Sequence, residues 1–585
     1  MSPFSGMLWN HRVDEHIALE ESPFMAAYAH SFEWGQEGDF YFEPLRQGTL
    51  HIDGGKLGKS GWGRPAFWAR NRCSGQTFVC ELAYSGNWQF NLDMRLQQNG
   101  PQRAKVINRS AQLFFSMGLA GHDRVLRVLA PGETVSTPAV HLGLFHQDTD
   151  MIVQATHAHV RHTVMPAQIA GYEVEIEANH RGYLCDRENE ADLLRDVDVA
   201  AAVGTELYVI DAGWYGNDPN NWGNNVGDWF AGSWLPNGLE PVAKHAHAIG
   251  MRFGLWVEIE GSGGNSTLKK EHPEWLLRRN GEPIAGGRGL DLSLPAVSAW
   301  AEAEISRIIE QYDLDMYRID HNNNLCPAGN RENQGMVEDV MWRYYDMFGN
   351  LFDRLRAKYP HVVFQNCAGG GGRLDWGTLA HFHNTELSDW MRMPRGLKIL
   401  QGVTMSLPPE ILLRTFGTET GELDLEGDID TQLRLAFIAR PILRGIAPSV
   451  EDLSPFLRER IAHHMGLYRT FIRPLLHECL VFHHTPFQPL SAPTPWCVLE
   501  YADPNRCRAM AGIFHTYESS ETIYHFTPRG IDRAQRYQVT HDNSGQTYQA
   551  EGRELMEKGI SIRLELPLSS ELLTFTILNS EPDCS

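Results

Sequence analysis

The sequence predicts a protein of several domains, with a central (β/α)8 barrel between two antiparallel β domains. The chain has 585 residues, which is too long for a single hydrophobic core. In the central part, short apolar runs alternate with segments of helical periodicity, a pattern typical of a parallel barrel. On both sides of it, short β-like segments are separated by Gly, Pro and Asn. We therefore place the domains at residues 1–168, 169–480 and 481–585.

The first domain is expected to be a β-sandwich. Its β-like segments include residues 40–44, 77–82 and 88–92, and Ala-Pro-Gly-Glu at 130–133 is typical of a turn between two strands. No helical periodicity of useful length is visible before Met165. The third domain, with β-like segments at 496–501, 523–526 and 560–566, is expected to be a smaller antiparallel β-sandwich.

The central domain repeats strand and helix in turn. Strands are expected at residues 172–177, 207–211, 253–258, 316–320 and 362–366, and helices at 190–203, 242–249, 299–312 and 341–359. The helix at 299–312, for example, places Ile305, Ile308 and Ile309 on one face. The last two strand–helix units are expected between about residues 404 and 476.

Bulk composition excludes some classes of partner. The formal net charge of −22 argues against nucleic acid and against an anionic membrane, because both repel an acidic surface. No apolar stretch is long enough to span a membrane. The nine cysteines are scattered singly, and no signal peptide is visible at the start, so we expect a cytoplasmic protein. The sequence leaves a homo-oligomer open.

Polar side chains follow several of the expected barrel strands. A barrel brings the C-terminal ends of all its strands to one rim, so these groups are expected to converge. They are Asp211 with Trp214, Trp256 with Glu258, Asp320 with Asn322, Cys367 with residues 369–372, and Glu386 with Asp389. Two carboxylates and a Trp in one pocket suit glycoside hydrolysis. For any single residue, a helix cap or a structural salt bridge is the alternative interpretation.

The glycine run at 369–372 lacks the Lys-Ser/Thr of a phosphate-binding loop, so we interpret it as a place where the backbone closely approaches a sugar. The paired histidines 245/247, 463/464 and 483/484 have no zinc-site spacing. Neither a metal nor a cofactor is expected.

Several motifs occur in a fixed order along the chain: Asp-Ala-Gly-Trp at 211–214, Gly-Leu-Trp at 254–256, Tyr-Arg-Ile-Asp-His-Asn at 317–322 and Cys-Ala-Gly-Gly-Gly-Gly-Arg at 367–373. Together they resemble family 36 of the glycoside hydrolases, the α-galactosidases and α-N-acetylgalactosaminidases. Tyr-Ser-Gly-Asn-Trp at 84–88 resembles part of that family's N-terminal β-supersandwich. The resemblance runs from about residue 60 to the end, and it implies a TIM barrel between this domain and a C-terminal β-sandwich.

The resemblance implies a retaining exo-α-glycosidase, which releases terminal galactose-type residues from an oligosaccharide or glycoside without a cofactor. Asp320 would be the nucleophile and Asp389 the acid/base, with their carboxyl groups about 5–5.5 Å apart. Arg318 is expected to keep Asp320 ionised. The positions implied to line the sugar pocket are Asp211, Trp214, Trp256, Arg288, Arg318, Asn322, Cys367 and Gly369.

Departures from the family pattern leave the identity of the sugar open. The usual Asp-Asp-Gly-Trp has Ala212 as its second residue here, and the usual Lys-Trp-Asp is Arg318-Ile319-Asp320. Glu386 stands where the family usually has Trp, three residues before the acid/base. An extra anion beside the pocket would favour a cationic sugar such as an unacetylated amino sugar. The alternative is that Glu386 pairs with Arg392 or Arg395.

Two other functions are compatible with the same motifs. A transglycosylase similar to the raffinose-type sugar synthases would pass the covalent intermediate to a sugar instead of water. A non-catalytic carbohydrate-binding homologue would lack one of the two carboxylates, and both Asp320 and Asp389 are present.

Overall fold

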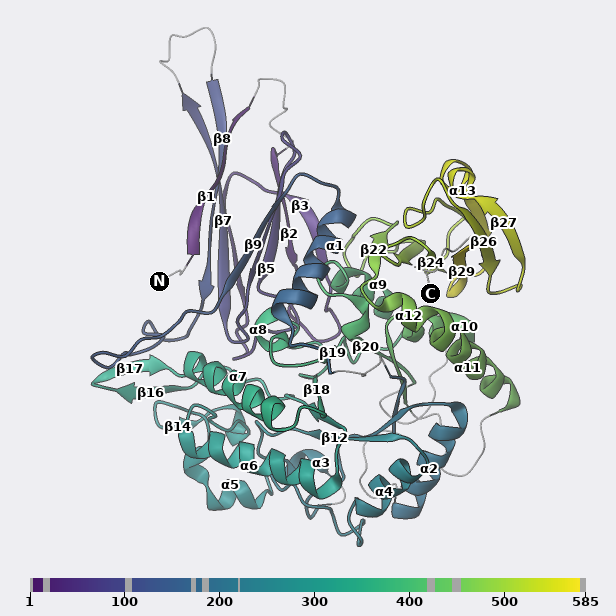
Figure 1. Ribbon diagram of the computed structural model, residues 1–585. Coiled ribbons are helices and arrows are strands. Elements are labelled where there is room, and N and C mark those ends of the chain that lie inside the picture. The colour runs from purple at the N-terminus through teal and green to yellow at the C-terminus, as the bar shows by residue number, and fades with distance from the viewer. Residues whose placement is uncertain are drawn as a thin grey trace.

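The computed structural model describes residues 4–13, 22–99, 108–169, 175–180, 189–218, 221–417, 427–444 and 454–578. The N-terminal strands stand above the barrel, and the C-terminal strands lie beside them (Figure 1). The predicted fold class is confirmed, because a closed parallel barrel lies in the chain between antiparallel sheets. Among the described residues, no helix is both long enough and apolar enough to cross a membrane.

The N-terminal domain consists of two antiparallel sheets. The first contains, in spatial order, β1 (Phe4–Val13), β8 (Asn108–Leu119), β7 (Trp88–Asn99) and β4 (Gly48–Gly54). The second contains β3 (Phe40–Pro44), β2 (Phe24–Ala29), β5 (Ala66–Asn71), β6 (Thr77–Leu82) and β9 (Val140–Phe145). Aromatic rings fill the space between them: the ring centroid of Phe67 lies 5.1 Å from that of Phe90 and 6.0 Å from that of Phe115.

One helix in this region was not predicted. Helix α1 (Thr149–His159) continues into a π-helical turn, η1 (Val160–Val164). Its buried face combines Ile152 and Val153 with Thr156 and His157, so the apolar face is interrupted by polar residues. This mixture weakens the hydrophobic periodicity by which an amphipathic helix is detected.

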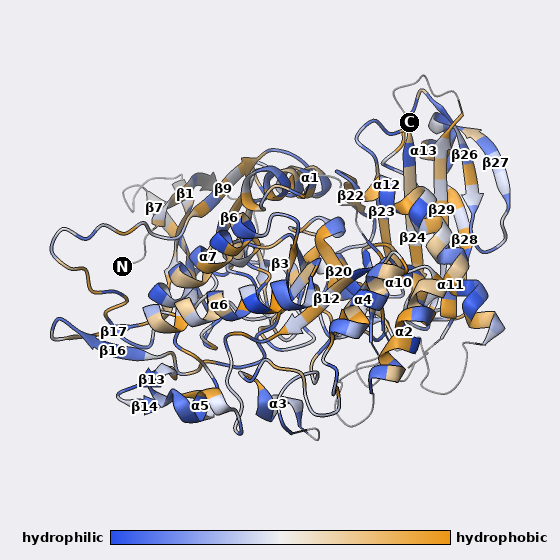
Figure 2. Cartoon of the chain, turned by 60° about the horizontal axis from the view of Figure 1, so that its bottom comes forward, coloured by the Kyte–Doolittle hydropathy of each residue, from blue (hydrophilic) through white to orange (hydrophobic). Residues whose placement is uncertain are grey.

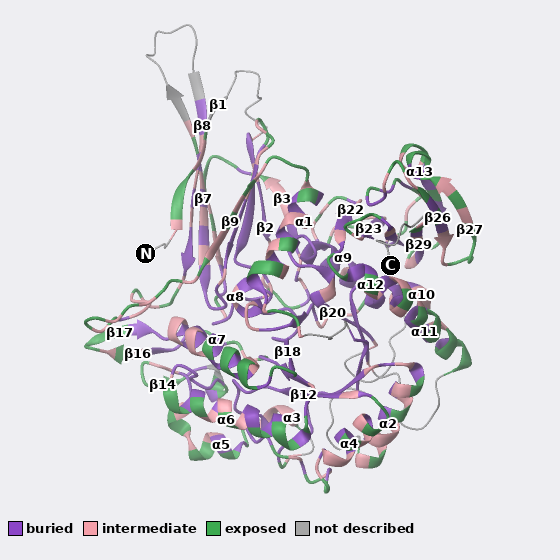
Figure 3. Cartoon of the chain, viewed as in Figure 1, coloured by how far each residue is buried: buried purple, intermediate pink, exposed green. Residues whose placement is uncertain are grey.

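The barrel closes with eight parallel strands. Their order is β10 (Glu177–Asn179), β11 (Leu207–Ile210), β12 (Arg252–Val257), β15 (Met316–Ile319), β18 (Val363–Asn366), β19 (Asn384–Glu386), β20 (Leu412–Phe416) and β21 (Arg440–Arg444). Strands β12 and β20 are largely hydrophobic (Figure 2), and β12, β18 and β20 are buried (Figure 3). Burial on both faces explains why barrel strands are continuous apolar runs.

The first barrel strand lies later than predicted. We expected residues 172–177, of which 172–174 lie outside the described residues, whereas β10 begins at Glu177. Its register is fixed by both neighbours, since Asn179 pairs with Val209 of β11 and Arg444 of β21. Strands β20 and β21 both fall between residues 404 and 476, as expected.

Helices surround the barrel: α2 (Glu190–Val203), α4 (Glu240–Ala248), α6 (Pro295–Tyr312), α7 (Met341–Lys358), α9 (Arg395–Val403), α10 (Ile429–Phe437) and α11 (Pro455–Leu467). Helix α2 begins with a capping box between Asn189 and Asp192 and ends at Gly204 in the left-handed conformation. These end signals explain why its predicted limits agree with the structure.

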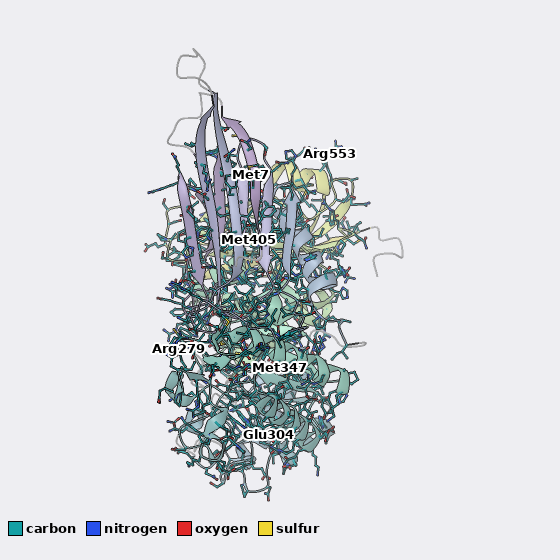
Figure 4. The ribbon with its side chains drawn as sticks, turned by 90° about the vertical axis from the view of Figure 1, so that its left-hand side faces the viewer. Met7, Arg279, Glu304, Met347, Met405 and Arg553 are labelled. Atoms are coloured by element: carbon teal, nitrogen blue, oxygen red, sulfur yellow. The ribbon has the colours of Figure 1, made fainter. Side chains whose placement is uncertain are left out.

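Shorter elements lie in the connections: α3 (Trp222–Asn225), α5 (Thr267–Glu271), α8 (Trp376–Leu379), α12 (Arg473–Leu476), η2 (Pro273–Trp275), η3 (Ala285–Gly287), η4 (Pro409–Ile411) and η5 (Tyr468–Ile472), with the hairpins β13 (Arg278–Arg279)–β14 (Glu282–Pro283) and β16 (Asn330–Asn333)–β17 (Met336–Asp339). Figure 4 shows Met7 of β1 and Glu304 of α6 towards opposite ends of the molecule.

The C-terminal domain has a six-stranded antiparallel sheet. Its order is β22 (Leu480–His483), β23 (Trp496–Ala502), β24 (Arg508–His515), β29 (Ser569–Ile577), β26 (Arg536–His541) and β27 (Thr547–Glu551). Strands β25 (Ile523–Phe526) and β28 (Ile560–Arg563) form a second sheet, beside helix α13 (Gly552–Lys558). Cys507 is disulfide-bonded, which the scattered cysteine spacing did not indicate.

Candidate active site

The C-terminal rim of the barrel collects most of the polar residues that the sequence singled out. Asp211 follows β11, Asp320 follows β15 and Cys367 follows β18, while Trp256 lies in β12 and Glu386 ends β19. All five are buried. Because these strands are hydrogen-bonded neighbours around the barrel, their ends meet at one rim.

The carboxylate of Asp320 is held by four N–H donors from described residues. Oδ2 accepts from Trp256 Nε1 at 3.0 Å and from Asn322 Nδ2 at 2.9 Å. Oδ1 accepts from the backbone N–H of His321 at 2.7 Å and of Gly369 at 2.8 Å. These bonds fix the orientation of the carboxylate and match its ionised form, which only accepts hydrogen bonds.

Arg318 makes no ion pair or hydrogen bond to Asp320 among the described residues, and its expected effect on the ionisation of Asp320 stays a prediction. The guanidinium instead donates to Glu177 Oε1 at 2.6 Å and to Gln365 Oε1, and lies 3.5 Å from Asp211 Oδ2. Burial lowers the pKa of Arg318, but the surrounding acids Glu177, Glu386 and Asp211 together outweigh it and raise the pKa above its usual range. Arg318 therefore belongs to a buried charge network beneath the rim.

Asp211 is the rim carboxylate of that network. Its Oδ2 accepts from Asn179 Nδ2 at 2.8 Å and from Arg444 Nη2 at 3.0 Å. Burial alone would raise the pKa of Asp211, yet Arg444, Arg318 and His180, with the backbone N–H of Ala212, lower it below the usual value. A permanent anion thus lies at the rim, and it can accept hydrogen bonds from sugar hydroxyls.

Glu386 faces the same network. Burial, opposed by Arg318 and assisted by Asp389, raises the pKa of Glu386 to about 8. Arg318, Arg444 and the buried Arg414 act on this carboxyl. No ion pair within 4.0 Å joins Glu386 to another described residue.

The glycine run links the two carboxylates that were predicted to be catalytic. The backbone of Gly369 donates to Asp320, as described above. Gly370 has φ +72°, and a Cβ there would lie 2.6 Å from the backbone nitrogen of Asp389 and 3.1 Å from Ser388. The backbone of this run therefore closely approaches the Asp389 loop, and its approach to a sugar stays a prediction.

Asp389 lies three residues after β19 and is half-buried. Its Oδ2 accepts a hydrogen bond from Trp34 Nε1 at 3.1 Å. Cys367 lies within electrostatic reach of both acids, because burial and the charges of Asp320 and Asp389 raise the pKa of its thiol well above the usual value. The neutral thiol thus belongs to the same pocket as the two carboxylates.

Two predicted pocket residues are placed differently. Trp214 is fully buried, and its indole N–H donates to the carbonyl of Trp256 at 2.9 Å. It therefore supports the backbone of Trp256, and it has no exposed surface that could touch a ligand. Arg288 is exposed on the loop after η3, and no hydrogen bond from its side chain to the rim carboxylates is present among the described residues.

Some site residues had not been assigned a role. Glu258, noted only as a strand-end group, accepts from the backbone N–H of Asn322 at 3.0 Å and from Asn323 Nδ2 at 2.9 Å. Burial and Asp320 raise the pKa of Glu258 to about 8. Its position two residues after Trp256 was a usable signal, since it follows the same strand.

The N-terminal domain supplies further groups that gave no signal in the sequence. Lys59 Nζ donates to the carbonyl of His321 at 3.0 Å, and burial lowers the pKa of this ammonium to about 8. Trp62 Nε1 donates to the carbonyl of Gly369 at 2.9 Å. The site is therefore formed by two domains.

One group of described side chains has the spacing of a metal site. Ligand atoms of His463, His464 and Asp542 lie within 4.8 Å of one another. Arg434 Nη2 donates to Asp542 Oδ2 at 2.5 Å, and this positive charge opposes a cation there. The group lies between α11 and the C-terminal domain, outside the barrel rim.

The family model described as Melibiase matches residues 134–436, which is more than half of the chain. The chain belongs to the melibiase family. Among curated melibiase relatives, it is 29% identical over 387 residues to alpha-galactosidase AgaA of Geobacillus stearothermophilus, which covers 64% of this chain and 51% of that protein. It is 27% identical over 362 residues to an alpha-galactosidase of Escherichia coli, with 60% and 47% covered. The chain thus spans about half the length of these relatives.

Solved structures of melibiase relatives share the fold. The crystal structure of AgaA, a GH36 alpha-galactosidase of G. stearothermophilus, matches with a TM-score of 0.83 and 22% identity, covering 95% of this chain and 75% of that chain. An alpha-galactosidase of Lactobacillus brevis matches with a TM-score of 0.82 and 22% identity, covering 96% and 74%. Variants of AgaA have been crystallised with stachyose and with raffinose.

Proposed function

We propose that this melibiase-family protein is a retaining exo-α-glycosidase that removes terminal α-linked galactose-type residues. The observation that carries the proposal is Asp320, a buried carboxylate oriented by four N–H donors, next to a glycine run that also packs against the Asp389 loop. The names of the curated relatives, which are alpha-galactosidases, support the same class of substrate.

In the first step, an oxygen of Asp320 attacks the anomeric carbon of the sugar. The bond to the leaving oxygen breaks, and that oxygen takes a proton from the carboxyl group of Asp389. The products are a covalent glycosyl-aspartate and a released alcohol or sugar. Trp256 and Asn322 hold the attacking carboxylate in position, so little reorganisation is needed during the attack.

In the second step, Asp389, now ionised, accepts a proton from water while the water oxygen attacks the anomeric carbon. The bond to Asp320 breaks, and the sugar leaves with its original anomeric configuration. A sugar hydroxyl that replaces water gives transglycosylation by the same residues. Trp34, which donates to Asp389 Oδ2, helps to orient this carboxyl group.

A second candidate glycone is a sugar with a positively charged amino group. The observation that favours it is Glu386, a buried acid without an ion pair among the described residues. Arg318 and Arg444, which face it, already bind Glu177 and Asp211. An ammonium group on the sugar would stabilise the ionised form of Glu386, which burial otherwise disfavours.

A substrate panel tests both candidates. We would measure hydrolysis of nitrophenyl α-galactoside, α-N-acetylgalactosaminide and α-galactosaminide, and follow the anomer released by NMR. We expect turnover with retention. Preference for either neutral sugar rejects the amino-sugar candidate, and the inverted anomer rejects the covalent intermediate. Binding without turnover would indicate a carbohydrate-binding protein, and a new trisaccharide would indicate a transglycosylase.

A further inference from the structure

Both side-chain donors to Asp320 Oδ2 depend on one barrel strand, β12. Trp256 lies in this strand and donates from Nε1 to Oδ2 at 3.0 Å. Glu258 follows two residues later, so its side chain points to the same face of the extended chain. Its carboxyl group accepts hydrogen bonds from Asn322, which is the second side-chain donor to Oδ2. The strand therefore acts on the proposed nucleophile directly through Trp256 and indirectly through Asn322.

The amide nitrogen of Asn322 lies between two carboxyl groups. Nδ2 donates to Asp320 Oδ2 at 2.9 Å and to Glu258 Oε2 at 3.2 Å, with one N–H group for each. The amide oxygen lies on the side of Gly369, where an added Cβ would be 3.4 Å from Oδ1. An amide donates from one side and accepts on the other, so its acceptors decide how it is turned.

The other oxygen of Glu258 already has two donors. Oε1 accepts from the backbone N–H of Asn322 at 3.0 Å and from Asn323 Nδ2 at 2.9 Å. The side chain is fully enclosed, since Glu258 is 1% exposed. Oε2 is therefore the atom that faces the Asn322 amide. A carboxyl oxygen can accept a hydrogen bond there whether or not the group carries a proton.

We propose that Glu258 is a positioning residue for the nucleophile, whose Oε2 fixes the orientation of the Asn322 amide and so keeps an N–H group on Asp320. The inference rests on the proposed function of Asp320. In an amide turned by 180°, Oδ1 would take the place of Nδ2 and face Asp320 Oδ2. Two acceptor oxygens would then meet, and the attacking carboxylate would lose a donor.

The test compares two substitutions of Glu258 in the full chain, on the nitrophenyl glycoside that the unsubstituted chain hydrolyses fastest. Glu258→Gln keeps the shape of the side chain. Its oxygen meets the two donors of Oε1, so its NH2 group faces the Asn322 amide and favours the turned form. We expect kcat/KM to fall about 10²-fold, as for loss of a preorganised donor.

Glu258→Ala removes the same charge and the same acceptor, but it adds no donor. We expect kcat/KM to fall only about tenfold, because Asn322 can still donate to Asp320. A purely structural role predicts the opposite order, since Ala leaves a cavity in a buried site and Gln does not. The order of the two variants therefore separates positioning of the amide from support of the fold.

A double-mutant cycle tests whether Asn322 transmits the effect. In the Asn322→Ala background, Glu258→Gln should change kcat/KM by less than about threefold, because no amide remains to be turned. Independent effects would multiply to about 10⁴-fold. The matched control is Glu175→Gln, since Glu175 is a buried acid that pairs with Arg252 at 2.7 Å, at the other end of β12. It should leave kcat/KM unchanged.

A smaller loss in Glu258→Gln than in Glu258→Ala would overturn the inference while the proposed function stands. Losses that multiply with Asn322→Ala would overturn it as well. If Glu258→Gln does not fold, the same cycle with Glu258→Ala decides, because its loss should also disappear in the Asn322→Ala background. If the unsubstituted chain turned over none of the nitrophenyl glycosides, the proposed function would fail, and this inference with it.

Discussion

The two proposed catalytic carboxylates have different surroundings. Asp320 is 6% exposed and is held by groups of the barrel alone, two of which are its own neighbours His321 and Asn322. Asp389 is half-buried and accepts a hydrogen bond from Trp34 of another domain. Attack at carbon requires a fixed geometry, whereas proton transfer requires an oxygen that can change its charge twice in each cycle.

The two domains supply different groups around these two carboxylates. The described donors to Asp320 all belong to the barrel, since they come from β12 or from the loops after β15 and β18. The N-terminal domain supports them indirectly, because Lys59 and Trp62 donate to the carbonyls of His321 and Gly369. It contacts Asp389, the proposed acid/base, directly through Trp34. Changes at the domain interface should therefore affect protonation of the leaving group more than attack on the sugar.

The largest effects should come from removing the carboxylates themselves. We expect Asp320→Asn to lower kcat by at least about 10⁴-fold on every substrate, because no covalent intermediate can form. Asp389→Asn should lower it about 10²–10⁴-fold on raffinose and much less on nitrophenyl α-galactoside. Steady-state kinetics with both substrates measure the difference. Equal losses for the two substrates in Asp389→Asn would contradict its role as acid.

A smaller effect is expected when one donor to Asp320 is lost. Asn322→Ala should lower kcat/KM by about 10²-fold, to a similar extent on both substrates, because it disturbs the nucleophile. Asn323→Ala is the matched control, since Asn323 donates to Glu258 and not to Asp320. If both variants lost the same activity, the hydrogen bond from Asn322 to Asp320 would have no special importance.

Gly370→Ala should disturb the acid/base selectively. Its Cβ would meet the backbone nitrogen of Asp389 at 2.6 Å, and its φ of +72° strains any L-residue. We expect about a tenfold loss on raffinose and a cost of about 1–3 kcal/mol in unfolding free energy. Gly281→Ala controls for strain alone, because Gly281 has φ +87° and nothing within 4 Å of an added Cβ. Equal loss of activity in the two variants would rule out the clash as the cause.

The smallest effect concerns stability and Glu386. Its pKa is raised from 4.5 to about 8 by burial, so the folded protein binds its proton more tightly than the unfolded chain. This contribution to stability is fully present below pH 4.5 and is lost as the pH rises through about 8. Between pH 5 and pH 8.5, the unfolding free energy of Glu386→Gln should fall less than that of the parent, by about 4 kcal/mol. Urea unfolding at both pH values measures this, and parallel losses would contradict it.

Much of the barrel could be predicted from the sequence, because its signals are local. The apolar run before Asp320 and the end signals of α2, from Asn189 to Gly204, gave elements close to those of the structure. The convergence of Asp211, Asp320 and Glu386 followed from the geometry of parallel barrels.

The remainder of the site depends on contacts that leave no local pattern. Trp34 and Lys59 reach the rim across 355 and 262 residues, and no periodicity records such pairings. Trp214 was predicted to line the pocket, but it is fully buried, because a sequence motif does not show whether other side chains pack over an aromatic ring. Arg318 was assigned to Asp320 by proximity in sequence, but Glu177, far earlier in the chain, is its partner.

The buried ammonium of Lys59 also has a consequence for how the protein matures. Asp320, Glu258 and Glu260 all act on this cation, which therefore offsets negative charge in the mouth of the barrel. An undocked barrel would hold these carboxylates with less compensation, and charges buried without a partner are costly. During synthesis, Lys59 leaves the ribosome some 200 residues before Glu258, and domains commonly fold in that order. A first domain that has already folded can thus supply Lys59 to the barrel carboxylates as the barrel folds against it.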